Sequence, residues 1–205
     1  ASKQQSLTIN GVEQTITFDA LPEKTFGDAP FELSATASSG LDVTFSSSDV
    51  AVASVEGVTV TILKAGSATI TASQVGNDNY SSAAATQTLT INKAAQTITF
   101  EALPAKTFGD APFALSASST SGLAVAYASS DATVAKVEGT NVSLLKPGSA
   151  TITASQAGSD NYRAAASVEQ SLVVSKAGQT ISFEPLAGKT FGDPAFELSA
   201  SSSTG

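Results

Sequence analysis

The octapeptide KTFGDAPF occupies residues 24–31 and recurs letter for letter at residues 106–113. A third copy, at residues 189–196, differs only in that its Ala and Pro are exchanged. Self-similarity at such a long and regular spacing is typical of stacked modules, each of which is one small folding unit. The chain is therefore predicted to be a tandem array.

The spacing of the copies divides the 205 residues into two complete repeats flanked by two partial ones. The opening stretch Leu7-Thr8-Ile9-Asn10 matches Leu89-Thr90-Ile91-Asn92, which ends a repeat. We therefore expect the parent protein to continue in both directions. The predicted boundaries are 1–13 for the last strand of a preceding repeat with its linker, 14–95 and 96–178 for the complete repeats, and 179–205 for the start of a truncated one.

Apolar and polar residues alternate within the first repeat with the period of two that indicates β-strands. In residues 67–73, for example, Ala68, Ile70 and Ala72 alternate with Ser and Thr. Six more short segments have this character: 14–18, 31–37, 43–45, 50–55, 58–63 and 88–92. Seven strands in about 80 residues are typical of an immunoglobulin-like sandwich. The predicted fold class is all-β, with tandem Ig-like β-sandwich domains of about seven strands each.

Composition and charge exclude several functional classes. The chain has no Cys and no His, so the common catalytic dyads and triads are absent and no disulfide can form. We therefore predict that it is not an enzyme. Its net charge of −8 disfavours nucleic acid and anionic lipid as partners. No apolar run is long enough to span a membrane.

Several motifs together resemble the bacterial immunoglobulin-like repeats classed as MBG domains. They are Gln14–Phe18, Thr25–Asp28, Ser47–Asp49, Ser67–Ala72 and Gly76–Tyr80. Such repeats occur in long surface and secreted bacterial proteins, including adhesins. The resemblance implies an extracellular or cell-surface location and a role as a structural stalk or filament segment, with neighbouring repeats of the same chain as the main partners.

Two alternative functions remain open at this point. The chain could be a binding module whose strand edges or turn loops grip a glycan or a protein. It could instead be a self-assembling filament whose copies join laterally through unpaired strand edges. An exposed aromatic cluster would favour the first alternative, and interlocked chains would favour the second.

Four aspartates are candidate calcium ligands, because hard cations take carboxylate and carbonyl oxygens. Asp28 and Asp110 lie in the repeated turn, and Asp78 and Asp160 lie in an oxygen-rich loop further along each repeat. The simpler interpretation is that the turn aspartates cap nearby backbone amides. For the loop, the simpler interpretation is that its tyrosine packs on the sandwich edge, as in a tyrosine corner.

The remaining residues of interest are predicted to be structural. Few large side chains other than phenylalanine are available to fill two sheets, so the phenylalanines are expected in the core, while glycines shape the repeated turn and tyrosines anchor the loop. They are Phe18, Phe26, Phe31, Phe100, Phe108 and Phe113, with Gly27 and Gly109, and with Tyr80 and Tyr162.

Overall fold

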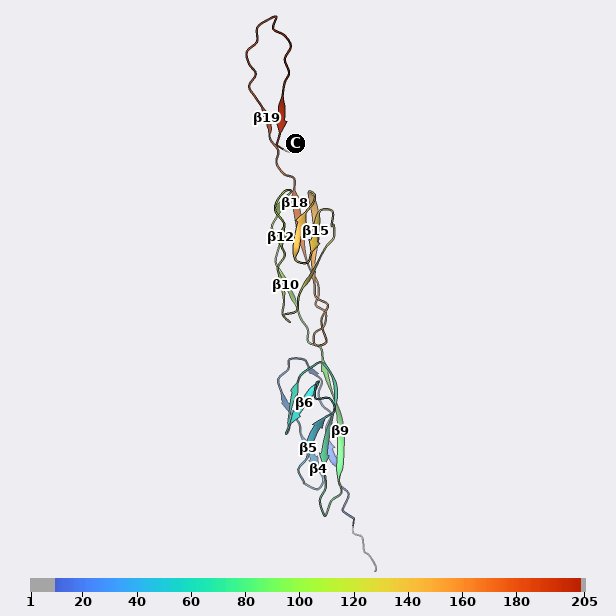
Figure 1. Ribbon diagram of the computed structural model, residues 1–205. Helices are drawn as coiled ribbons and strands as arrows, with labels where there is room; N and C mark the ends of the chain where they lie inside the picture. Colours follow the sequence, from blue (N-terminus) through green and yellow to red (C-terminus); the bar gives the residue numbers. More distant parts are fainter. Residues whose placement is uncertain (1–9, 204–205) are drawn as a thin grey trace, which may run out of the picture. The chain divides into compact units, whose positions relative to one another are not determined.

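The computed structural model describes residues 10–203, and every regular element in that range is a β-strand (Figure 1). The expected strand at residues 7–10 lies, apart from Asn10, outside the described residues. The chain forms two compact units. The first extends through Ile98 and also takes in Ser119–Ala124 and Gln156–Ala166, and the second takes Thr99–Ser118, Val125–Ser155 and the chain from Ser167 onward.

The strands follow the sequence repeat. The first copy contains β1 (Ile16–Phe18), β2 (Lys24–Thr25), β3 (Phe31–Glu32), β4 (Ala35–Ala37), β5 (Thr44–Ser47), β6 (Ala53–Glu56), β7 (Thr59–Ile62), β8 (Gly66–Gln74) and β9 (Ala83–Asn92). The second contains β10 (Ile98–Phe100), β11 (Lys106–Thr107), β12 (Phe113–Ala114), β13 (Ala117–Ser119), β14 (Ala126–Ser129), β15 (Ala135–Glu138), β16 (Asn141–Leu144), β17 (Gly148–Ser155) and β18 (Val168–Ser175). The third begins with β19 (Ile181–Phe183) and β20 (Ala200–Ser202).

The same three sheets form in each of the first two copies. The first copy has a four-stranded sheet in the order β2-β9-β8-β5, a three-stranded sheet in the order β3-β7-β6, and the pair β1-β4. The second copy repeats these as β11-β18-β17-β14, β12-β16-β15 and β10-β13. The pairs β2-β9 and β11-β18 run parallel. The neighbouring pairs β5-β8, β8-β9, β14-β17 and β17-β18 run antiparallel, as do the pairs β6-β7 and β15-β16 of the smaller sheets. The fold is therefore all-β, with tandem Ig-like sandwiches as the sequence predicts.

The core of each copy lies between its sheets and is built from the inward-facing half of each alternating strand. Along β8, Ala68, Ile70 and Ala72 are buried, as the alternation predicts. Ile70 and Leu89 are fully buried in the first copy. Burying one such side chain contributes about 1.5–3 kcal/mol to folding. The second copy buries Ile152 and Leu172 at the corresponding places.

Three details of the strands differ from the sequence-based expectation. The short strand β2 falls in none of the seven expected segments. The segment 31–37 forms two strands, because the chain changes sheets after Glu32: β3 pairs with β7, whereas β4 pairs with β1. The strand expected at 88–92 begins earlier, at Ala83, because β9 pairs with β8 from Ala83 to Ile91. Pairing with a long neighbouring strand overrides the weak β-propensity of alanine.

The phenylalanines occupy three environments rather than one. Phe18 and Phe100 are buried, whereas Phe26, Phe31 and Phe113 are half-buried. The ammonium groups of lysines lie over two of the half-buried rings, Lys24 over Phe31 and Lys106 over Phe113. Phe108 departs from the expectation, because 43% of it is exposed rather than packed in the core.

Phe108 follows the short edge strand β11, and no aromatic ring pair covers it among residues 10–203. Its counterpart Phe26 occupies the same place but is covered by an aromatic ring. The third copy exposes even more apolar surface, with Phe183 51% and Phe191 fully accessible. There, β19, β20 and the segment that connects them line an open hollow of about 400 Å³.

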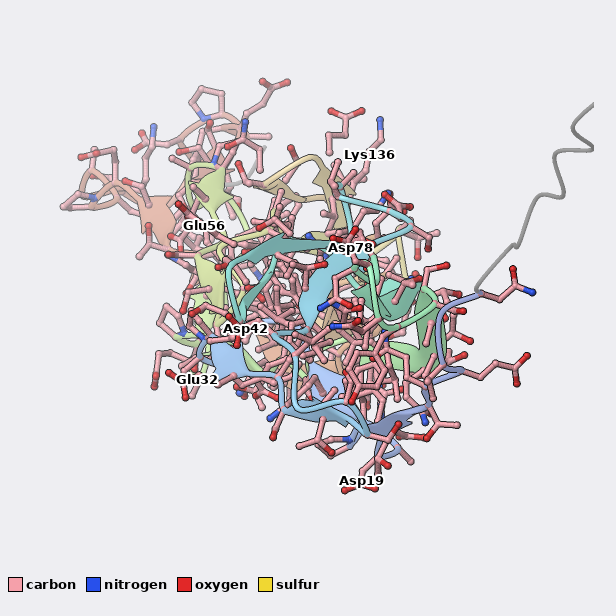
Figure 2. The ribbon with its side chains drawn as sticks, turned by 90° about the horizontal axis from the view of Figure 1, so that it is seen from below. Asp19, Glu32, Asp42, Glu56, Asp78 and Lys136 are labelled. Atoms are coloured by element: carbon pink, nitrogen blue, oxygen red, sulfur yellow. The ribbon has the colours of Figure 1, made fainter. Side chains whose placement is uncertain are left out.

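Acidic side chains lie on the outside of the strands. Asp19, Glu32 and Asp42 are exposed, and Figure 2 shows Asp19 extending away from the ribbon. Among the described residues, no buried side-chain nitrogen or oxygen lacks a hydrogen-bond partner. These carboxylates therefore remain in contact with solvent, and the few buried polar side chains have hydrogen-bond partners within the protein.

Candidate functional site

A tight loop, residues 76–80, follows β8 in the first copy and returns at residues 158–162 in the second. We call these two segments the tyrosine loops, because each ends in a half-buried tyrosine. In the first, the amide of Asn77 donates to the carbonyl oxygen of Tyr80 at 2.9 Å, and Oδ1 of Asn77 accepts from the amides of Asn79 and Tyr80. A short polar side chain thus shapes the turn by capping its own backbone.

The second tyrosine loop uses a serine for the same purpose. Ser159 donates its amide to the carbonyl oxygen of Tyr162 at 3.0 Å, and its Oγ accepts from the amides of Asn161 and Tyr162 at 3.2 and 3.3 Å. The glycine that opens each loop has a positive φ, +84° at Gly76 and +86° at Gly158. A Cβ at Gly158 would lie 2.5 Å from the carbonyl oxygen of Tyr162, so only glycine fits.

Each tyrosine loop holds the stretch of chain that leads into its own copy. The amide of Ala94 donates to the carbonyl oxygen of Asn161, and the amide of Arg163 donates back to the carbonyl oxygen of Ala94, both at 2.9 Å. Ala94 and Tyr162 therefore form a parallel bridge, as Val12 and Tyr80 do in the first copy. The linker that follows β9 is thus hydrogen-bonded through both the amide and the carbonyl group of Ala94.

A buried glutamine fastens the other side of this linker. Gln96 is only 7% exposed, and its Nε2 donates to Oε1 of Gln156 and to the carbonyl oxygen of Arg163, each at 2.6 Å. Gln14 makes the same two bonds, to Gln74 and Ser81, in the first copy. A buried amide that satisfies several partners at once specifies one geometry, because any displaced geometry leaves buried groups unpaired.

The second tyrosine loop also contacts residues of the first copy, and all of these residues belong to the first compact unit. The ring of Tyr162 lies edge-on against Phe26, with centroids 5.6 Å apart and an interplanar angle of 81°. The edge-to-face arrangement is one that aromatic pairs prefer. It brings a loop of the second copy onto the turn motif of the first.

Three polar contacts surround this ring pair. Nζ of Lys64 lies 3.0 Å from a carboxylate oxygen of Asp160, and the amide of Ala65 donates to Oδ1 of Asn161 at 3.0 Å. Nζ of Lys93 donates to the carbonyl oxygen of Ser159 at 2.7 Å. The hydrogen bond from Lys64, followed by its positive charge and then that of Lys93, lowers the pKa of Asp160. The carboxylate therefore stays ionised, and the contact stays attractive, over the neutral pH range.

Two of the four candidate calcium ligands, Asp28 and Asp78, belong to the first copy, and Asp110 and Asp160 belong to the second. Asp28 accepts a hydrogen bond from the amide of Thr25 at 2.8 Å, and Asp110 accepts the corresponding bond from Thr107 at 2.9 Å. Asp160 pairs with a lysine, as described above. Asp78 is exposed. Within residues 10–203, no three acidic side chains gather in a group that could hold a metal ion. This geometry favours the capping interpretation of the turn aspartates, and calcium stays a hypothesis.

Sequence reasoning named the tyrosines, Phe26 and Asp160 but not their mutual contact. It also missed Lys64 and the buried glutamines Gln14 and Gln96. The signal for the glutamines was available, because each opens its repeat at the same position, just before a strand of alternating pattern. Lys64 recurs as Lys146 at the same position of the second copy, but its place in the sequence does not show that it pairs with a loop of the next copy.

No protein-family model and no curated protein matches the chain. Solved structures are similar to it at low identity. Drosophila N-cadherin EC1-4 is 14% identical, with 85% of this chain and 51% of that chain covered and a TM-score of 0.33. The S-layer protein rSbsC(31-844) is 17% identical, with 84% and 30% covered and a TM-score of 0.33. Titin domains I67-I69, in an E-to-A variant, are 14% identical, with 91% and 86% covered and a TM-score of 0.35.

The likeness is to tandem Ig-like and cadherin-like segments, and this chain spans about half of the N-cadherin chain and less than a third of the S-layer chain. All three TM-scores are below 0.5, so the fold assignment rests on the sheets themselves. None of the three proteins is named for a catalytic activity. No helix within the described part of the chain is long and apolar enough to cross a bilayer.

Proposed function

We propose that this chain is a structural stalk or filament segment of a bacterial cell-surface or secreted protein, in which consecutive Ig-like modules hold a binding head away from its anchor. The observation that carries the proposal is the tyrosine loop. It holds the linker through two backbone hydrogen bonds to Ala94 and places its ring on Phe26 of the preceding copy. A segment whose purpose is to transmit position needs neighbouring modules that keep their orientation.

The chemistry of the sequence supports the same proposal. The motifs that resemble those of MBG repeats support an extracellular, adhesin-like parent protein. An acidic exterior rich in Ser and Thr keeps a repetitive chain soluble and disfavours sticking between copies. The two complete copies have the same strand order, so each step along the chain repeats the same sheets. Stability is then close to a sum over copies and their junctions.

Electron microscopy of the purified chain, and of versions with further copies inserted, tests the proposal. Single threads that lengthen by a constant increment per copy are the expected result. Bundles of interlocked chains would replace the stalk with the self-assembling filament. Threads of variable length and random bend would contradict the proposal, because the junctions would then not hold orientation.

A glycan- or protein-binding role is the second candidate, and the exposed ring of Phe108 is the feature that favours it. Sugar rings stack on exposed aromatic faces. Binding of the chain and of its Phe108→Ala variant to a glycan array therefore tests the glycan-binding role directly. Binding that the variant loses would support the binding role. The absence of saturable binding would leave the stalk as the function.

A further inference from the structure

We propose that the surface around Phe108 and Lys146 is an acceptor for the tyrosine loop of the copy that follows it in the parent protein. The inference rests on the proposed function, since it names the partner surface through which the stalk continues. It starts from the one occupied example, in which the second tyrosine loop sits against Phe26 and Lys64.

The acceptor in the first copy is built by the register of three strands. Ile91 of β9 pairs with Lys24 of β2 on one side and with Gly66 of β8 on the other. Phe26 follows β2 directly, and Lys64 lies just before β8. The strand pairing thus brings an aromatic ring and a positive charge to the same end of one sheet.

The second copy reproduces this register. Val174 of β18 pairs with Lys106 of β11 and with Gly148 of β17. The amide of Phe108 donates to the carbonyl oxygen of Ser175 at 2.9 Å, as that of Phe26 does to Asn92. Phe108 and Lys146 are therefore placed as Phe26 and Lys64 are.

Exposure distinguishes the two acceptors. Phe26 is half-buried under Tyr162, whereas Phe108 is 43% exposed and forms no ring pair among residues 10–203. The chemistry of the missing occupant follows from the occupied example: a tyrosine for the ring, preceded by an aspartate for the lysine. Both existing tyrosine loops carry Asp-Asn-Tyr.

One contact cannot be repeated. The amide of Ala65 donates to Asn161, but the corresponding residue in the second copy is Pro147, which has no amide hydrogen. The second acceptor must therefore hold its loop without this hydrogen bond, whereas Lys176 and Ala177 stand where Lys93 and Ala94 make theirs. The substitution Ala65→Pro reproduces this difference in the occupied junction, where its effect can be measured in the chain as it stands.

The test uses the full chain, with tyrosine selectively labelled for NMR, because only three tyrosines are present. Phe26→Leu is expected to change the ring chemical shifts of Tyr162 and leave those of Tyr80 in place. Ala65→Pro is expected to leave Tyr162 at its ring-shifted position. Release of Tyr162 by Ala65→Pro would overturn the inference, since an acceptor with proline there could not hold a loop.

A second experiment completes the third copy by adding the sequence of residues 123–178 after Gly205, which matches Gly122. Phe108→Leu should then shift the ring signals of the added loop tyrosine, as Phe26→Leu shifts those of Tyr162. If Tyr162 responds and the added tyrosine does not, the acceptor inference fails and the stalk proposal stands. If Tyr162 itself does not respond to Phe26→Leu, the contact between Phe26 and Tyr162 is absent, and the acceptor inference and the stalk proposal fail together.

A second molecule is the competing occupant, and sedimentation of the unextended chain distinguishes it. We expect a monomer at all concentrations. Self-association that Tyr80→Ala abolishes would assign the Phe108 surface to another chain and overturn the inference.

Discussion

The ring pair between Phe26 and Tyr162 predicts a measurable coupling between positions that are 136 residues apart in the sequence. The rings meet edge-on at 5.6 Å. Such pairs contribute about 0.5–1.5 kcal/mol beyond the area they bury. We therefore expect the variants Phe26→Ala, Tyr162→Ala and the double variant to give a coupling energy of about 1 kcal/mol in a double-mutant cycle.

The cycle is needed because Phe26 also packs against the core of the first copy. Phe26→Ala alone removes both kinds of contact, and only the coupling term isolates the ring pair. Urea denaturation followed by the amide signals of β8 and β9 gives the stability of the first copy separately. A 1 kcal/mol effect corresponds to about 4–8 °C in the melting temperature of a module of this size.

The chain supplies its own matched control. Phe108 and Tyr80 are the same residue types at the same places in the repeat, but no ring pair joins them. Their cycle should give no coupling beyond the roughly 0.3–0.5 kcal/mol scatter of independent sites. Coupling within that scatter for Phe26 and Tyr162 as well would refute the reasoning, because the loop would then not rest on the first copy's turn.

Three further predictions concern the loop, its ion pair and the acidic turns. Gly158→Ala should lower the stability measured in urea by more than Gly27→Ala does. Both glycines have positive φ, which costs other residues about 1–2 kcal/mol, but only a Cβ at position 158 would also clash with the backbone. Equal losses of stability in the two variants would contradict this reasoning. Lys64 lowers the pKa of Asp160 in the folded chain. The ion pair between them therefore contributes fully to stability above the ordinary carboxyl pKa of 3.8, and its contribution is lost as the pH falls through the lowered pKa of the folded state. Asp160→Asn should therefore reduce stability at pH 7 but not near pH 2, whereas Asp78→Asn, which removes no ion pair among residues 10–203, should leave the profile unchanged; a profile of Asp160→Asn parallel to wild type would exclude the ion pair. A chelator should leave the melting temperature unchanged, because backbone amides already occupy the turn carboxylates; a fall in that temperature would instead support calcium.

Much of the fold follows from the alternation of apolar and polar residues. Each of the seven expected segments overlaps one or more strands, and the inward set along β8 is the one that the pattern indicates. The change of sheet within residues 31–37 was not predictable, because the alternation continues on both sides of it. Leu33 is buried, and its amide bonds to Val58 while the chain crosses between sheets.

The candidate site was harder to predict, for a physical reason. Tyr162 was expected to pack on the edge of its own sandwich, whereas its ring meets Phe26 of the preceding copy. A repeat read by itself cannot show which of its loops meets a neighbour, because both partners recur in every copy. The exposure of Phe108 was unpredictable for the same reason, since Phe108 and Phe26 lie in identical octapeptides and only their neighbouring copies differ.

Residual dipolar couplings test the central claim most directly, because they report whether two parts of a chain keep a fixed orientation. Measured on the amides of β1–β9 and of β10–β18 in the whole chain, they should fit one alignment tensor. In the Tyr162→Ala variant, the two sets should diverge as the ring contact is lost. Two independent tensors in the unaltered chain would contradict the account, because modules that reorient freely cannot serve as a stalk.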